Sequence, residues 1–149
     1  MKLLKLEVTG LPLFKERCEI DFLSLQRVSA DNADKMSKVF VNSTNEFYQN
    51  NVLSFIGINA SGKTTILKLI TFVCRMLNNE PINSIEASEI LDDLAENQYV
   101  TFKTYFSASN KETFPFTDGI AINLLETTIA KTKEKLIISN ETLKSKSIT

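Results

Sequence analysis

One stretch constrains this chain more than any other, because it joins an uncharged apolar run to a glycine-bounded loop and then to a helix-like run. It covers residues 52–65 and reads VLSFIGINASGKTT. Gly57 is followed by four residues and then by Gly62-Lys63-Thr64, which completes the pattern of a phosphate-binding loop. The apolar run predicts a buried strand over 52–56, and the residues after the loop predict a helix. The sequence therefore predicts the strand, loop and helix that such a site requires.

The residue types in this loop suit a bound polyphosphate. Glycines at the two ends of the loop permit positive φ and let the main chain approach an anion closely. Backbone amides from the loop and from the first helical turn would converge on the phosphates at the positive end of a helix. We expect the nucleotide to contact Gly57, Asn59, Ala60, Ser61, Gly62, Lys63, Thr64 and Thr65.

Lys63 and Thr64 have distinct expected roles. A cation in the first helical turn opposes the helix dipole and costs about 0.3–1 kcal/mol when no anion is present. Its position becomes favourable when the β- and γ-phosphates of ATP lie between the ammonium and the helix end. The Thr64 hydroxyl is the expected protein ligand for Mg²⁺, which takes its other ligands from water and phosphate. An ordinary strand-to-helix turn with a solvated lysine is the alternative interpretation.

Composition limits the other chemistries that need consideration. The chain has 149 residues, 43% of them hydrophobic, and a net charge of −1, which suits one globular domain over 1–149 and gives no overall attraction to nucleic acid. It has no histidine, which excludes Ser-His-Asp and Cys-His catalysis and most zinc sites. Cys18 and Cys74 are expected to be reduced core thiols, which favours a cytoplasmic location. No apolar run has the length of a transmembrane helix, so we expect no membrane partner.

Hydrophobic periodicity predicts the elements before the loop. Apolar and polar residues alternate over 2–9 and again over 17–22, which predicts a β-hairpin with a short turn. Residues 24–51 are richer in polar side chains and predict an excursion, with a helical turn or two around 33–40.

The same patterns predict the elements after the loop. An apolar run predicts a helix over 64–78 buried between layers, and 84–95 predicts a short acidic helix. Alternation over 99–106 predicts a strand that begins a meander. Further predictions for this part of the chain are a turn at 114–119, strands at 120–125 and 135–139, a turn at 139–141 and a frayed end at 142–149.

This order of parts resembles the first segment of the ABC-type ATPase head found in the SMC/RecF group and in bacterial AAA family ATPases related to overcoming-lysogenization (OLD) nucleases and abortive-infection ATPases. The resemblance is strongest over 1–22 and 52–78, and Asn59 is the residue favoured by that group at the third loop position. It implies an α/β P-loop NTPase fold: an incomplete N-terminal lobe with a mixed sheet around one central helix, followed by an antiparallel meander. It also implies ATP and Mg²⁺ as cofactors.

The chain departs from the pattern of this group in its first turn. The turn commonly holds Asn-Phe-Arg-Ser-Phe, whose arginine approaches the nucleotide, whereas residues 10–14 here read GLPLF. Lys15 or Arg17 could substitute for that arginine. The alternative is that both are solvated strand charges, the usual position of such residues.

A second departure concerns catalysis. A Walker B motif is an apolar strand ending in Asp and Glu, which completes the Mg²⁺ site and activates water. The only Asp pair, Asp92-Asp93, falls in a helical pattern and is expected to be a solvated helix face. The chain also has no Ser-Gly-Gly signature, no glutamine after Gln98 for a Q-loop and no switch histidine. We therefore expect these residues to be the N-terminal lobe of a longer ATPase that is inactive alone.

Several partners and functions follow from the resemblance. The expected partners are ATP, the missing C-terminal half of the head and a second copy in a homodimer, with DNA or a nuclease as candidates in nucleic-acid handling or phage defence. A non-hydrolysing nucleotide-binding fragment or regulatory module is the alternative. A compact kinase is less favoured, because Arg75, the only arginine after the loop, lies on the predicted helix rather than on a lid. Uncovered apolar faces and an exposed sheet edge predict that the isolated chain self-associates.

Overall fold

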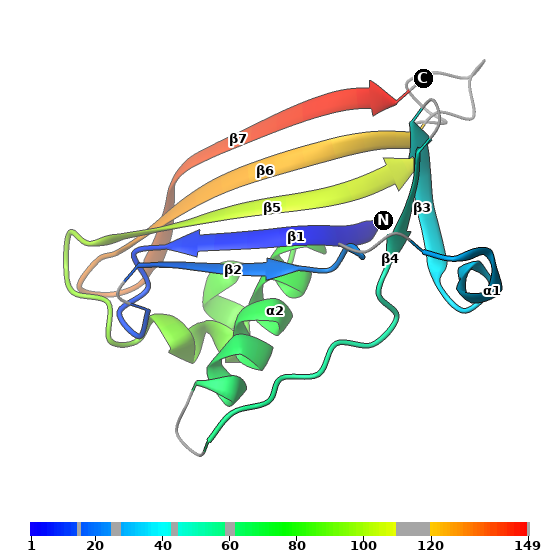
Figure 1. The fold of residues 1–149 in the computed structure, drawn as a ribbon. Helices are drawn as coiled ribbons and strands as arrows, with labels where there is room; N and C mark the ends of the chain where they lie inside the picture. Colours follow the sequence, from blue (N-terminus) through cyan, green and yellow to red (C-terminus); the bar gives the residue numbers. More distant parts are fainter. Residues whose placement is uncertain (15, 25–27, 43–44, 59–61, 110–119, 149) are drawn as a thin grey trace.

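A five-stranded antiparallel sheet forms the frame of the molecule. The structure is a computed structural model and describes residues 1–14, 16–24, 28–42, 45–58, 62–109 and 120–148. The spatial order of the strands is β2-β1-β5-β6-β7 (Figure 1). Their bounds are Lys2–Thr9 for β1, Arg17–Asp21 for β2, Tyr99–Ser109 for β5, Ile120–Lys131 for β6 and Leu136–Ile148 for β7.

Strand β1 joins the two ends of the chain into one sheet. Leu6 of β1 lies opposite Ile20 of β2 on one side and opposite Thr104 of β5 on the other. The predicted hairpin and the predicted meander are both confirmed, and they are parts of the same sheet. All the pairings between described strands are antiparallel, so the mixed sheet expected from the resemblance is not found among them.

The end of the meander is more regular than its sequence predicts. Strand β7 runs through the predicted turn at 139–141 and the predicted frayed end, so both predictions are wrong for residues up to 148. The polar residues at 139–141 lie at a β-bulge within the strand. Asn140 pairs with Thr128 and Ile138 pairs with Ile129, which leaves Ser139 as the extra residue. The Ser139 hydroxyl donates to the carbonyl of Thr128 at 3.1 Å. The predicted turn at 114–119 lies outside the described residues.

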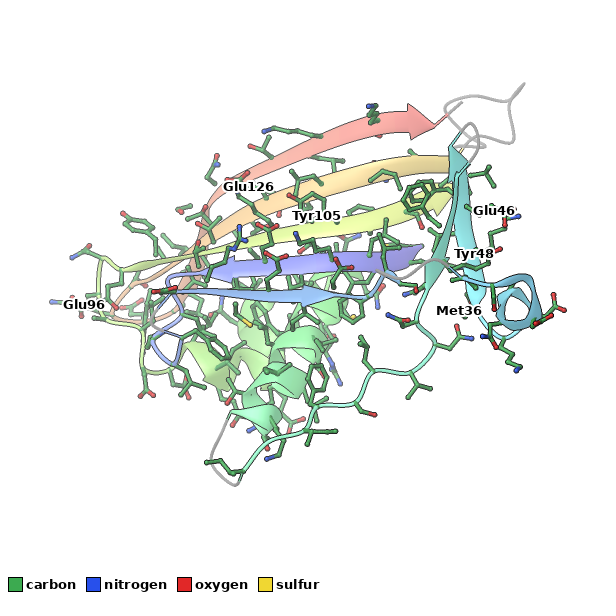
Figure 2. All side chains as sticks on the ribbon, viewed as in Figure 1. Met36, Glu46, Tyr48, Glu96, Tyr105 and Glu126 are labelled. Atoms are coloured by element: carbon green, nitrogen blue, oxygen red, sulfur yellow. The ribbon has the colours of Figure 1, made fainter. Side chains whose placement is uncertain are left out.

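Helix α2, Lys63–Leu77, packs on one face of this sheet and confirms the predicted helix to within one residue at each end (Figure 1). The rings of Phe72 and Phe102 lie 5.5 Å apart between helix and sheet. Helix α2 is not buried between two layers as predicted, because Leu67 remains 54% exposed. Short 3-10 helices at Ile82–Ser84 and Glu86–Leu91 replace the predicted acidic helix. Side chains fill the space between helix and sheet (Figure 2). The core there includes Leu6, Val8, Leu69, Phe72, Val73, Met76, Ile85, Leu91, Val100, Phe102 and Ile129.

The polar excursion before the loop folds as a separate hairpin. Strands β3, Ser37–Asn42, and β4, Asn45–Gln49, follow a single helical turn, α1, at Ala30–Ala33. The helix predicted around 33–40 is therefore wrong beyond residue 33. The rings of Phe40 and Phe47 stack across the two strands with centroids 4.4 Å apart. Aromatic cross-strand pairs of this kind stabilise a hairpin, which stands at one end of the main sheet (Figure 1).

The hydroxyl of Thr104 is a buried polar group whose hydrogen bonding is unsatisfied. The side chain is fully buried, and its oxygen has no hydrogen-bond partner among the described residues. Thr127, equally buried on β6, donates its hydroxyl to Glu141 at 3.1 Å. We expect Thr104→Val to raise the free energy of unfolding by about 1 kcal/mol, because it removes an unsatisfied polar atom. The matched change Thr127→Val should lower it by about 1 kcal/mol. Urea denaturation measures both, and a loss of stability in Thr104→Val would contradict the prediction.

Candidate functional site

The segment that leads into the phosphate-loop motif belongs to neither described sheet and to no described helix. Val52 is 81% exposed and Ile56 is 97% exposed, whereas Phe55 is partly buried against the core. The predicted buried strand over 52–56 is therefore wrong. An apolar run becomes a buried strand only where neighbouring strands pair with it, and no described strand of this chain does so.

Helix α2 begins directly after the second glycine of the motif. Gly62 is the N-cap and has a φ of 84°, in the left-handed region that glycine adopts without strain. The amide of Ile66 donates to the Gly62 carbonyl at 3.0 Å, which is the first bond of the helix. Helix geometry leaves the amides of Thr64 and Thr65 without an acceptor inside the helix. The cap has no side-chain hydrogen bond and the first turn holds no acidic residue, so this end favours an anion.

The Lys63 side chain connects the two ends of the motif. Its ammonium donates to the carbonyl of Gly57 and to the carbonyl of Ile58, each at 2.7 Å. The first residues of the loop are thus held next to the first residue of the helix by two charge-assisted hydrogen bonds. Asn59, Ala60 and Ser61, which complete the predicted contact set, lie outside the described residues.

Thr64 and Thr65 both lie in the first turn of α2, and Thr64 is exposed. The predicted role of the Thr64 hydroxyl in holding Mg²⁺ stays a prediction. Among the described residues, no group of three or more His, Cys, Asp or Glu side chains could hold a metal ion. Asp92 and Asp93 are exposed, as predicted, but they follow a 3-10 helix and do not lie on a helix face.

The turn between β1 and β2 reaches the start of α2, which the sequence did not indicate. A Cβ added at Gly62 would lie 3.7 Å from Leu13 Cδ2 and 4.0 Å from Phe14 Cε1. Two apolar side chains thus flank the helix end at the turn where the resembling group carries an arginine. The sequence contains these apolar residues in the run GLPLF over 10–14. Only the packing of the hairpin against α2 brings them to the start of the helix.

Three further cations that the structure describes, Lys5, Arg17 and Arg75, form ion pairs. Arg17 is on β2, where its exposed guanidinium lies 3.4 Å from a carboxylate oxygen of Glu7. Lys5 pairs with the same strand-face carboxylates, and its hydrogen bonds to Glu19 and Glu7 raise its pKa above the usual value. Arg75 lies near the end of α2 and pairs with Glu80 at 3.1 Å. Lys15 lies outside the described residues.

Both cysteines are free thiols, and burial raises the pKa of Cys18 and of Cys74 above the ordinary thiol value. Cys74 lies on α2, and Cys18 on β2 is packed against the same core. A thiol with a raised pKa is protonated at neutral pH and is a weak nucleophile. The structure thus gives neither cysteine the environment of a catalytic thiol.

Within the described part of the chain, no helix has both the length and the apolar character needed to cross a membrane. Comparisons with protein-family models, with curated proteins and with solved structures give no match to this chain.

Proposed function

We propose that this chain binds ATP together with Mg²⁺ through the loop from Gly57 to Thr65, in the cytoplasm. The observation that carries the proposal is the arrangement of Lys63, which begins α2 and donates to the carbonyls of Gly57 and Ile58 at the other end of the motif. These bonds hold the ammonium against the first residues of the loop, whereas Lys63 itself belongs to the uncapped first turn of the helix. A polyphosphate at this point would meet a positive charge, helix amides and the helix dipole together.

The wider proposal is that the chain acts as the nucleotide-binding lobe of an ATP-hydrolysing head of the SMC/RecF/OLD-like kind. In this proposal the loop holds the phosphates, Thr64 holds Mg²⁺, and a further protein segment supplies the Walker B carboxylates. That segment, a second copy of the head and DNA or a nuclease are the proposed partners. The antiparallel hairpin-plus-meander sheet with α2 on one face is compatible with such a lobe.

A non-hydrolysing nucleotide-binding module is the second candidate. It is favoured by the exposed position of Asp92 and Asp93 at the end of a 3-10 helix. None of the strands that the structure describes ends in an Asp-Glu pair, so no carboxylate for activating water is identified among them. The two candidates share the same phosphate site and differ only in turnover.

Calorimetric titration of the 149-residue chain with ATP and with GTP, each with Mg²⁺, tests the proposal. Phosphate release is then measured on the same samples. We expect binding without turnover, because the loop is present and the catalytic carboxylates are not identified. Failure of both nucleotides and of inorganic tripolyphosphate to bind would overturn the proposed site. Turnover by the isolated chain would instead show that it contains a catalytic carboxylate and would contradict the lobe interpretation.

A further inference from the structure

The turn between β1 and β2 presents an apolar side chain to solvent beside the start of α2. Leu13 is 56% exposed. Its Cδ2 atom lies 3.7 Å from the position that a Cβ would take at Gly62, the N-cap of the helix. Single exposed leucines are common on protein surfaces. This one is distinguished by its place, because it borders the loop to which the phosphates are assigned.

The backbone of the turn holds this side chain in a defined position. The amide of Phe14 donates to the carbonyl of Leu11 at 3.0 Å, which closes a β-turn. Pro12 and Leu13 are its two central residues, and the proline ring fixes the first φ. Leu11 is only 2% exposed and anchors the turn in the core. The turn bends toward the face of the sheet that α2 covers (Figure 1), so Leu13 is preorganised next to the helix end.

The turn offers a ligand apolar surface and no side-chain hydrogen bonds. Residues 10–14 read GLPLF and contain no polar side chain. A nucleoside triphosphate has two parts that match this arrangement. Its polyphosphate suits the loop and the first turn of α2, and the carbon-rich faces of its ribose and base suit an exposed leucine. The apolar turn and the phosphate loop thus fit the two ends of one ligand.

We propose that Leu13 packs against the nucleoside of the bound nucleotide, and that the site takes nucleoside triphosphates with little preference between adenine and guanine. This role for Leu13 rests on the proposed function, because the phosphates must occupy the loop first. An apolar contact does not distinguish the hydrogen-bonding edges of the bases, since every base presents a similar face. Sites that reject a ligand strongly do so by leaving a hydrogen-bonding group unpaired, and the turn has no such side chain.

Calorimetric titration of the Leu13→Asn variant tests this role. Asparagine is uncharged, similar in size to leucine and favoured in turns, so the fold should stay intact, which circular dichroism checks. We expect the affinity for Mg²⁺-ATP and for Mg²⁺-GTP to fall about fivefold, because the apolar contact is lost. The affinity for inorganic tripolyphosphate, which has no nucleoside, should stay within about twofold of the wild type. The wild type should bind ATP and GTP with affinities within about threefold of each other.

The matched control is Leu143→Asn, which makes the same change at a leucine that is 60% exposed on β7. It should leave the affinities for all three ligands unchanged. Three results would overturn the role of Leu13 and leave the phosphate site intact: unchanged nucleotide affinity in Leu13→Asn, an equal loss for tripolyphosphate, or a preference of more than about tenfold between ATP and GTP. Failure of all three ligands to bind the wild type would instead overturn the proposed function, and the role of Leu13 with it.

Discussion

Replacing Gly10 by alanine will lower the free energy of unfolding by about 2–5 kcal/mol, the sum of a backbone strain and a steric clash. Gly10 follows β1 with a φ of 84°, and a Cβ there would lie 2.2 Å from the carbonyl oxygen of Tyr99. That oxygen belongs to the first residue of β5, which pairs with Ala130 of β6, so it moves only if the pairing of β5 with β6 is disturbed. For a domain of this size, each kcal/mol corresponds to a melting temperature lower by about 2–4 °C.

Gly62 provides a matched control for Gly10. It has the same φ of 84°, but the nearest side-chain atom to an added Cβ would be Leu13 Cδ2, at an ordinary contact distance of 3.7 Å. Gly62→Ala should therefore cost only the left-handed strain, about 1–2 kcal/mol. Thermal and urea denaturation measure the free energy of unfolding of both variants. The difference between the two losses gives the cost of the clash at Gly10. Equal losses of stability in the two variants would show that the backbone at Tyr99 relaxes around the new methyl group.

The second large effect is expected at Lys63. Lys63→Ala should weaken the binding of Mg²⁺-ATP by a hundredfold or more. The substitution removes the charge-assisted hydrogen bonds that we expect between the ammonium and the phosphates, worth about 1.5–3 kcal/mol each. In the structure its ammonium donates to the carbonyls of Gly57 and Ile58. Calorimetric titration with ATP and with tripolyphosphate measures the loss. Both ligands should be affected equally, because the lysine is expected to contact only phosphate.

Lys68 is the control for charge and helix propensity. It lies on the same helix, but its ammonium pairs with Glu89 and not with the loop. Lys68→Ala should leave nucleotide affinity within about twofold of the wild type, because exposed ion pairs contribute little. Unchanged ATP affinity in Lys63→Ala would remove the phosphate site from this chain. A similar loss in both variants would indicate a general effect of positive charge on α2.

Much of the secondary structure could be predicted because it rests on local patterns. The alternation of Leu4, Leu6 and Val8 predicted β1, and these three residues are buried in the structure. The same reasoning identified β2, the first part of β5 and helix α2. In each of these elements the buried side is defined by the spacing of its own residues, which requires no knowledge of the partner.

Pairing and packing could not be read from those patterns, because they depend on residues distant in the chain. The pattern of 52–56 predicted a buried strand, yet Ile56 is almost fully exposed since no described strand lies beside it. The polar residues at 139–141 predicted a turn, but pairing with β6 makes them a bulged strand. The stacked rings of Phe40 and Phe47 similarly form only once β3 and β4 meet.

In the candidate site, too, some features follow from local sequence and others from packing between distant residues. The sequence by itself determined the motif from Gly57 to Thr64, the start of the helix and the chemical types that suit a polyphosphate, because these depend on residues within one short segment. Only the tertiary structure decided that Lys63 bridges to the carbonyls of Gly57 and Ile58. It also placed Leu13 and Phe14 beside Gly62. Those contacts arise because the β1–β2 turn and α2 pack against one core, and packing is a property of the whole chain.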